Sequence, residues 1–357
     1  MQPLQVTLVS RVRLNPYVSL LAEALAAREP QGRFDQAREL SLPAALLPWG
    51  RRRVWHLHWP ELLYRAPHPL WAGLRWVRLI GLLALFRASG GRLVYTVHNL
   101  HLHEEAYPFL ERWTDRLLFA WAAGIHVHDA QAQAGVARQW GRDDAVVIAH
   151  GNYVGAYPDA CRRSEARERL GLPPQARVFL FLGGLRRYKG LEELVEAFVP
   201  LAQKERDAWL LVMGHAHEPA FAAELAERLQ GLGQVRFAPG HVPDEELQFP
   251  MRAADFAVLP YRRATTSGAA ILALSFGLPL IAPAIGPFPE LLADGGGVLY
   301  DPETPDGLAG ALQAALAADG AALAGQAAAA AARLDWGDLA QGHLALYRRV
   351  VGAGGRP

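Results

Sequence analysis

The feature that most constrains this chain is a steady alternation of short apolar or β-branched runs with longer segments of helical periodicity. Such alternation is typical of βαβ units, whose strands pair in parallel within a sheet covered by helices. In the first half, the runs expected to form strands are Gln5–Val9, Val54–Leu57, Leu93–Val97, Ala123–Val127 and Ala145–Ala149. Helical patterns fill the gaps, for instance at Pro16–Arg28, where Asn15 and Pro16 form a favourable helix start.

The alternation breaks once and then restarts. Residues 156–176 are polar and contain proline, so we interpret them as a linker with a short helix. The strands expected after them are Val178–Leu182, Trp209–Met213, Val235–Phe237, Phe256–Leu259, Leu280–Ile281 and Gly297–Leu299. The sequence therefore predicts an α/β protein with two doubly wound domains, over residues 1–155 and 177–335. A last helical segment, 336–357, could return to the first domain.

Two features of this pattern bear on function. Ligands of doubly wound sheets bind outside the carboxyl ends of the strands, so we expect the site in a cleft between the domains. The alanine-rich stretch over residues 308–333 predicts a pair of surface helices without chemistry, because alanine is the strongest helix former.

Composition narrows the class of protein. The chain is 51% hydrophobic and 20% charged, which is typical of globular rather than disordered proteins. Cys161 is its one cysteine, so no disulfide can form within the chain and a reducing compartment is indicated. The opening residues lack a cleavage site for a signal peptide, and the apolar run Leu79–Phe86 is too short to span a bilayer. These observations predict a cytoplasmic protein.

Net charge is only +1, but residues 51–92 are strongly basic and rich in tryptophan. The basic residues there are Arg51, Arg52, Arg53, Arg65, Arg75, Arg78, Arg87 and Arg92, with Glu61 as the one acid. The tryptophans are Trp55, Trp59, Trp71 and Trp76. Arginine and tryptophan beside an apolar helix favour binding to an anionic membrane surface, and a core helix with a solvated basic face is the alternative. Nucleic-acid binding is not indicated, because no lysine-rich tract or nucleic-acid motif is present.

Several motifs in the second half follow one another in an order that resembles a known family. They are FLGGLRRYKGLEELVEAF (181–198), GHVPDEEL (240–247), AADFAVLPYR (253–262), ALSFGLPLIAP (273–283) and PFPELLADGGGVLYDPET (287–304). Together they resemble the C-terminal domain of group 1, family 4-like glycosyltransferases of the GT-B fold. The resemblance is looser in the first half, at HLHWPE (56–61), YTVHN (95–99) and VIAHGNY (147–153). It implies transfer of a sugar from a nucleotide-sugar donor.

The glycine-rich turn before residue 190 carries the first candidate donor contacts. Lys189 and Arg186 follow a strand end, where their cations can neutralise a leaving diphosphate. The alternative is an exposed basic turn that pairs with Glu192 or Glu193. In the family, the lysine contacts the donor phosphates and an arginine precedes it by five residues. Gly184 occupies that arginine's position here, so Arg186 is a substitute by position.

A second candidate phosphate site lies in YRRATTSGAAILALSFG (261–277). Free N–H groups and the dipole at a helix start attract anions, and small hydroxyl residues also cap helices. The donor-binding residues expected in this segment are Tyr261, Thr265, Thr266, Ser267 and Gly268.

The same segment departs from the family at two positions. Retaining members carry two glutamates eight residues apart that contact the donor sugar and its ribose, whereas Ala264 and Leu272 stand here. The form TTSG…LALSFG instead resembles bacterial exopolysaccharide β-mannosyltransferases. That resemblance implies an inverting enzyme that uses GDP-mannose and a lipid-linked acceptor at the inner face of the cell membrane.

An inverting transfer needs a general base, and YTVHNLHLHEE (95–105) supplies candidates at a strand end. His98 and Asn99 match the family's strand-end residues, and His103 with Glu104 matches its His-Glu pair. We therefore predict His98, His103 and Glu104 as catalytic, and Asn15, Asn99 and His126 as acceptor contacts. His128 and Asp129 are weaker candidates, and His150 is expected near the donor.

Two other interpretations of these histidines stay open. They could be structural residues of a polar loop. A zinc site is disfavoured, because His101 and His103 point to opposite sides of an extended segment and no cysteine joins them. The chain also lacks an obvious pair of carboxylates for a divalent metal, so we expect neither a cofactor nor a metal.

Three functions are compatible with these motifs. The favoured one is inverting glycosyl transfer to a lipid-linked sugar. A retaining transferase or an epimerase-like protein would keep the fold, but the missing glutamates disfavour it. A non-catalytic module that binds a nucleotide sugar would suit the missing glutamates but not the retained Lys189.

Overall fold

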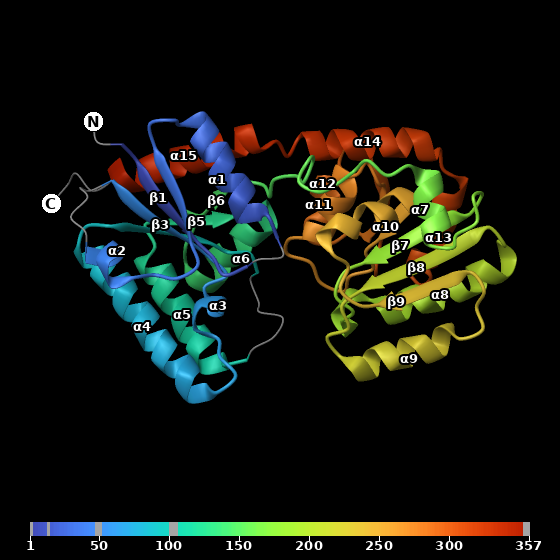
Figure 1. The fold of residues 1–357 in the computed structure, drawn as a ribbon, viewed down its shortest axis with the longest axis horizontal. Helices are drawn as coiled ribbons and strands as arrows, with labels where there is room; N and C mark the ends of the chain where they lie inside the picture. The colour runs from blue at the N-terminus through green and yellow to red at the C-terminus, as the bar shows by residue number, and fades with distance from the viewer. Residues whose placement is uncertain (1–2, 13–14, 47–51, 100–105, 353–357) are drawn as a thin grey trace. The chain divides into compact units, whose positions relative to one another are not determined.

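A computed structural model describes residues 3–12, 15–46, 52–99 and 106–352. The chain forms two compact units, residues 1–151 with 335–357 and residues 152–334, called unit 1 and unit 2 below. Each unit has its own parallel sheet with helices on both sides (Figure 1). The predicted pair of doubly wound α/β domains is confirmed.

The described part of unit 1 has a six-stranded sheet in the order β2-β1-β3-β4-β5-β6. Its strands are β1 (Gln5–Val9), β2 (Arg33–Ala37), β3 (Arg53–His58), β4 (Arg92–Thr96), β5 (Gly124–Val127) and β6 (Val146–Val147). Its helices are α1 (Tyr17–Arg28), α2 (Leu42–Leu46), α3 (Glu61–Tyr64), α4 (Pro69–Ala88), α5 (Pro108–Trp121), α6 (Ala130–Trp140) and α15 (Trp336–Gly352).

Strand β2 is absent from the predicted set. Its sequence, RFDQA, has no apolar run, because it pairs only with β1 at the edge of the sheet and none of its residues is fully buried. The last helix, α15, packs against α1 within unit 1, and its residues Leu344 and Tyr347 belong to the core.

The described part of unit 2 has a six-stranded sheet in the order β12-β11-β10-β7-β8-β9. Its strands are β7 (Arg177–Leu182), β8 (Ala208–Gly214), β9 (Val235–Pro239), β10 (Phe256–Val258), β11 (Leu280–Pro283) and β12 (Gly297–Tyr300). Its helices are α7 (Arg163–Arg169), α8 (Leu191–Lys204), α9 (Pro219–Leu229), α10 (Gln248–Ala253), α11 (Gly268–Ser275), α12 (Phe288–Leu291), α13 (Gly307–Ala317) and α14 (Gly320–Ala332), with 3-10 turns at Arg187–Lys189 and Asp244–Glu246.

Two predictions about unit 2 need correction. The short helix expected in segment 156–176 forms as α7, but the segment belongs to unit 2, because α7 packs against α10 and the buried Arg167 bonds to Asp255, 2.9 Å away. The alanine-rich stretch does form a helix pair, but its inner faces are core rather than surface. Leu312 of α13 and Ala327 of α14 are fully buried.

The basic segment 51–92 is also less superficial than predicted. Trp55 is buried and stacks on Phe86 with ring centroids 3.9 Å apart, and the buried Arg53 lies against the same Phe86 ring. Trp59 stacks on His98 at 3.6 Å. Trp71, by contrast, is exposed on α4, so only part of the predicted surface is accessible.

Candidate active site

The candidate donor residues meet where the strand order of unit 2 reverses. The chain runs from β7 to β8 and β9 on one side, then returns to β10, β11 and β12 on the other. Loops that follow β7 and β10 therefore diverge at the carboxyl edge of the sheet, which is where doubly wound folds bind ligands. The loop after β7 carries Lys189, and the loop after β10 carries Tyr261 and Ser267.

A glycine brings these two loops into contact. Gly190 has φ +69°, and a Cβ there would lie 1.8 Å from the carbonyl oxygen of Pro260. A larger residue would therefore push the loops apart. The Arg262 N–H also donates to the carbonyl of Tyr188 at 3.0 Å. The sequence KG thus holds Lys189 against the end of β10.

The Lys189 ammonium group lies over aromatic rings and close to backbone. Its Nζ is 5.1 Å from the centroid of Tyr261 and 6.0 Å from that of Phe181. Burial lowers the pKa of Lys189, and the positive charge of Arg186 lowers it further. No ion pair to Lys189 is found within the described residues. Its charge is thus available to a phosphate.

Neighbouring arginines take the carboxylates that could have neutralised Lys189. Arg187 pairs with Glu192 at 2.8 Å and with Glu224 at 2.7 Å. Arg262 pairs with Glu193 at 2.6 Å. The alternative of an exposed basic turn paired with Glu192 or Glu193 therefore describes Arg187 and Arg262, but not Lys189.

The start of α11 is capped by a side chain. The Ser267 hydroxyl accepts from the N–H of Ala270 at 3.1 Å. Burial raises the pKa of Tyr261, so its hydroxyl stays protonated. Thr265, Thr266 and Gly268 are half-buried beside this cap. Capping and phosphate binding are thus compatible uses of the segment.

The two positions that depart from the family are packed as apolar sites. Ala264 and Leu272 both lie against the core of unit 2. At the third departure, a Cβ on Gly184 would lie 2.9 Å from the ring of His217, whose ring nitrogens lie 3.3 and 3.4 Å from the Arg186 guanidinium. His217 therefore occupies the space beside Gly184.

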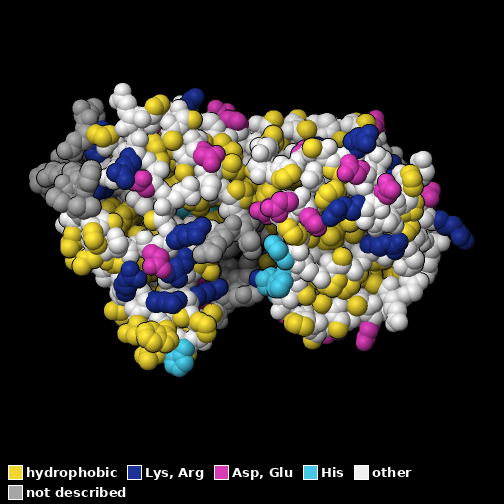
Figure 2. All heavy atoms as spheres, in the orientation of Figure 1, with side chains coloured by type: hydrophobic (Ala, Val, Ile, Leu, Met, Phe, Trp, Pro, Cys, Tyr) yellow, Lys and Arg dark blue, Asp and Glu magenta, His cyan; other side chains and the backbone are white. Residues whose placement is uncertain are grey.

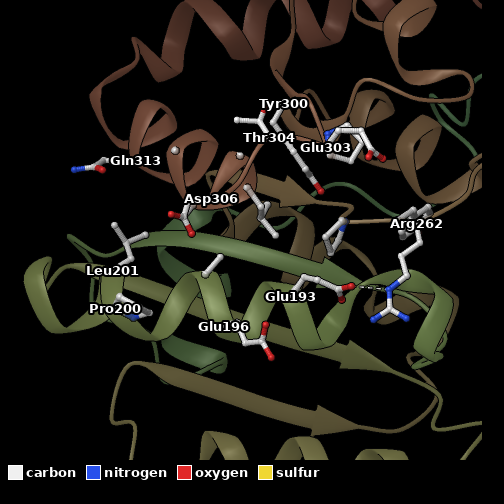
Figure 3. Close-up of a pocket in the computed structure, with 18 of the residues that line it drawn as sticks. Glu193, Glu196, Pro200, Leu201, Arg262, Tyr300, Glu303, Thr304, Asp306 and Gln313 are labelled. Carbon is white, nitrogen blue, oxygen red and sulfur yellow. Dashed lines mark hydrogen bonds and ion pairs between the residues drawn. The ribbon is translucent and has the colours of Figure 1, made fainter.

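A groove of about 860 Å³ runs between α8 and the loop before α13, and Tyr261 is among the residues that line it (Figure 3). Carboxylates line it, among them Glu193, Glu196, Glu303 and Asp306, and Arg262 stands at one end. These charges would repel a diphosphate, and Lys189 does not line the groove. It is therefore a poor candidate for the donor site.

The corresponding edge of unit 1 is filled by histidines. They come from the ends of three adjacent strands, from the segment after β6 and from α15, and all are buried: His56, His58, His98, His126, His128, His150 and His343. Tyr17 of α1 lies in their midst, with its ring 5.4 Å from that of His98 and 4.7 Å from that of His150. Such a set of imidazoles stays buried at low cost only if its polar atoms find partners.

One backbone carbonyl determines which nitrogen of four histidines carries the proton. The oxygen of Ile148 contacts His126 Nε2 at 2.8 Å and His128 Nδ1 at 3.3 Å. A carbonyl only accepts, so both nitrogens must be protonated. His128 Nε2 then accepts from His98 Nδ1 at 3.2 Å, and His98 Nε2 accepts from His58 Nδ1 at 3.1 Å. The hydrogen bonds in this chain all run in one direction.

The second branch is equally constrained. His126 Nδ1 accepts from the Thr96 hydroxyl at 2.8 Å, and Thr96 accepts from His56 Nε2 at 2.6 Å. His56 Nδ1 accepts from the Tyr347 hydroxyl at 2.7 Å. Both branches are consistent only with neutral rings, because a neutral imidazole has one nitrogen that donates and one that accepts.

The first branch ends on a bare nitrogen. His58 Nε2 is buried and has no hydrogen-bond partner, and neither has His343 Nε2, whose ring donates through Nδ1 to Leu339. Burial lowers the pKa of His58 to about 3 and those of His150 and His343 to about 4. Burial also holds the pKa values of His56, His98, His126 and His128 well below the usual range.

The residues of unit 1 predicted as catalytic or acceptor-binding do not all lie together at the carboxyl edge. His98 lies at the strand end, but both of its ring nitrogens bond to other histidines. His126 lies deep in the network, which is a poor position for an acceptor contact. Asn15 accepts from the N–H of Tyr17 at 2.9 Å at the start of α1, and Asn99 is half-buried after β4. His103 and Glu104 lie outside the described residues.

Sequence reasoning missed His56, His58 and His343 as members of this network. A signal was available: HLH (56–58) and HVH (126–128) each place two histidines two residues apart, hence on one face of a strand. His343 gave no such signal, because it comes from a helix nearly two hundred residues away from Ile148.

Comparison with known proteins places the second half of the chain beside one family. Residues 162–332 match the model of glycosyl transferases group 1, and they include Lys189, Tyr261 and Ser267. The matched region lies in unit 2 and spans most of it.

Individual relatives are distant. The chain is 27% identical over 278 residues to a GDP-mannose:glycolipid 4-beta-D-mannosyltransferase of Xanthomonas campestris pv. campestris, covering 75% of this chain and 70% of that protein. It is 28% identical over 344 residues to a D-inositol 3-phosphate glycosyltransferase of Segniliparus rotundus, covering 90% of this chain and 75% of that protein. Sucrose-phosphate synthase from Thermosynechococcus elongatus superposes with a TM-score of 0.71 at 20% identity, over 99% of this chain and 100% of that one. That likeness confirms the predicted GT-B fold.

Proposed function

We propose that this protein is a glycosyltransferase that moves mannose from GDP-mannose, with inversion, to a lipid-linked saccharide in polysaccharide or glycolipid synthesis. The observation that carries the proposal is the edge of unit 2 where β7 and β10 diverge. Lys189, without an acidic partner in the described chain, lies there beside the capped start of α11. A cation and the N–H groups of a helix start suit a leaving nucleoside diphosphate.

Inversion is supported by what stands at the two glutamate positions. Ala264 and Leu272 offer no carboxylate to the donor sugar or its ribose, and both are packed against the core. The acceptor hydroxyl would then attack the anomeric carbon directly as the bond to the diphosphate breaks. Its proton would pass to a base, and the product would have the opposite anomeric configuration to the donor.

We propose the pair His103 and Glu104 as that base. The described histidines of unit 1 support this choice by elimination. Burial depresses their pKa values, and the two bare ring nitrogens found, on His58 and His343, are enclosed. None of them is thus well suited to receive a proton from an acceptor. The base is expected among residues 100–105, where a histidine and a carboxylate adjoin.

The choice of donor and acceptor is supported by the mannosyltransferase of Xanthomonas campestris, which is named for GDP-mannose and a glycolipid. The D-inositol 3-phosphate glycosyltransferases support a second candidate, a family 4 enzyme that retains configuration and uses another donor. A cytoplasmic location at the membrane face follows from a lipid-linked acceptor. We further propose that neither a metal nor another cofactor takes part.

A panel of nucleotides tests the donor. A ligand that binds the native state raises the melting temperature by mass action, so GDP should stabilise more than UDP or ADP. GDP-mannose with a lipid-linked acceptor should then give a β-linked product, and chelation with EDTA should leave the rate unchanged. A preference for UDP, an α-linked product, or loss of activity in EDTA would each contradict the corresponding part of the proposal.

A further inference from the structure

Large apolar side chains gather on the surface of unit 1 where α4 and α5 begin. Six residues form this α4–α5 patch, and each is at least 39% exposed: Leu70, Trp71, Leu74, Val77, Phe109 and Trp113. Figure 2 shows apolar side chains gathered at the tip of the unit that carries these helices, with basic side chains beside them. A contiguous apolar surface of this kind is typical of a binding site.

Helix α4 is apolar on two opposite faces. Its inner stripe, which includes Leu79, Leu83 and Phe86, is buried in the core of unit 1. Its outer stripe continues from Leu70 through Leu74 to Val77, at the spacing of one helix face. Within the described chain, α4 is the one unbroken helix long and apolar enough to cross a membrane by length and composition. Its inner stripe would have to leave the core for it to do so.

Exposed positive charge lies on the same two helices as the patch, and one of its arginines, Arg78, is 4.0 Å from the exposed Glu39 outside them. Arg75, Arg78, Arg87, Arg112 and Arg116 are exposed on the same two helices. Helix α4 contains no acid, and the two acids of α5 are turned inward. Glu111 is buried and pairs with Arg65 at 3.0 Å, while Asp115 is half-buried. The exposed surface of both helices is therefore apolar and cationic.

Aromatic rings and guanidinium groups are also paired within the patch. The Arg116 guanidinium lies 5.5 Å from the ring of Trp113, whose centroid is 6.2 Å from that of Phe109. Rings of this kind settle at the level of lipid headgroups while arginine reaches the phosphates. A second copy of this chain would bring like charges together, and an acidic protein would not need the apolar side chains.

We propose that the α4–α5 patch docks this protein onto an anionic lipid bilayer, with the apolar side chains inserted into the headgroup region and the arginines on lipid phosphates. The docking would bring unit 1 close to a lipid-linked acceptor, and this role in acceptor binding rests on the proposed function. The docking itself does not depend on it, so binding to vesicles can be measured without donor or acceptor.

The test is flotation of the full chain with vesicles of phosphatidylcholine, with and without a third of phosphatidylglycerol. The protein should float with the anionic vesicles only, and raising salt should release it. Replacing Trp71 and Phe109 by alanine should weaken binding by at least about tenfold, because two inserted rings are lost. Reversing Arg75 and Arg78 to glutamate should weaken it by a similar factor.

Matched controls lie on unit 2. Val154 is 61% exposed, and Arg206 is exposed as well, so Val154→Ser and Arg206→Glu remove the same kinds of side chain away from the patch. Both should float like the unaltered protein. Arg112→Glu should weaken binding through charge alone, since no hydrogen bond of its side chain is found in the described chain. Thermal melts of each variant separate lost binding from lost folding.

Three results would overturn the docking proposal. They are flotation equal with neutral vesicles, patch variants that float as well as the unaltered protein, and a lipid-free dimer that the patch variants abolish. The last would make a second copy the occupant. Failure of the proposed function looks different: the protein would float with anionic vesicles but would not transfer mannose even to a short, soluble acceptor. Patch variants should retain transfer to that soluble acceptor.

Discussion

The two units place different kinds of side chain at the carboxyl edge of their sheets. Unit 1 fills it with seven buried histidines that are neutral and hydrogen-bonded within the unit, whereas the histidines of unit 2, His215, His217 and His241, are all exposed. Unit 2 instead places a lysine, a tyrosine and a capping serine at its edge. The same topology therefore carries a cation at the edge of one unit and a neutral polar network at the edge of the other.

The difference indicates which change should disturb each unit most. The network of unit 1 depends on protonation state, because a ring that donates through one nitrogen and accepts through the other must be neutral. The edge of unit 2 depends on a single cation that no acid neutralises in the described chain. Lowering the pH should therefore reduce mainly the stability of unit 1. Replacing Lys189 should abolish the activity that depends on unit 2 without unfolding it.

Acidification should have the largest effect. The folded pKa values of His58, His150 and His343 are about 3 to 4, below the unfolded value of 6.5. The unfolded chain therefore binds more protons in that window, and stability is full above pH 6.5 and falls as pH drops toward 4. Each such histidine removes about 1.4 kcal/mol per pH unit, so unit 1 should lose several kcal/mol by pH 5.

Urea unfolding at pH 7.5, 6 and 5, followed by tryptophan fluorescence, measures this loss. The signal reports mainly unit 1, which holds nine of the ten tryptophans, all but Trp209. His343→Phe should reduce the pH dependence by about one proton. His241→Asn, in exposed surface of unit 2, should leave it unchanged. Equal stability at pH 7.5 and 5 would show that the network does not stay neutral.

Loss of the Lys189 cation should come next. Lys189→Ala should lower turnover by about a hundredfold or more, equivalent to ~3 kcal/mol of transition-state stabilisation. Its melting temperature should hardly change, because no ion pair to Lys189 is found in the described structure. Arg187→Ala is the matched control, since Arg187 already pairs with Glu192 and Glu224. Unchanged kinetics for Lys189→Ala would remove it from the donor site.

Much of this comparison was accessible from the sequence, but unevenly. The strands of both sheets followed from apolar runs, and β2 was missed because an exposed edge strand needs none. The placement of Lys189 at the carboxyl edge of unit 2 could be predicted because a turn, its lysine and the following helix are close together in sequence. The opposite edge could not, because its hydrogen bonds join β3, β4, β5 and α15, and one backbone carbonyl sets their direction.

Breaking the network without changing charge should have a smaller effect. Thr96→Val removes the hydroxyl that accepts from His56 and donates to His126. Two buried ring nitrogens then lack partners, which should cost about 2 kcal/mol of unfolding free energy. Thr304→Val, at an exposed threonine of unit 2, should cost less than about 0.5 kcal/mol. Urea unfolding of the pair decides whether the network stabilises unit 1.

The smallest expected effect is at the cap of α11. Ser267→Ala removes the hydroxyl that accepts from the N–H of Ala270, so stability should fall by about 1 kcal/mol. If the N–H groups of the helix start hold the diphosphate, the variant should still bind GDP, because backbone groups and Lys189 remain. Ser267→Gly should recover most of the stability, since glycine is tolerated as a cap. Titration calorimetry with GDP separates the two uses of the serine. A loss of GDP binding as large as that of Lys189→Ala would mean that the hydroxyl itself is a main phosphate contact, and the edge of unit 2 would then depend on more than one cation.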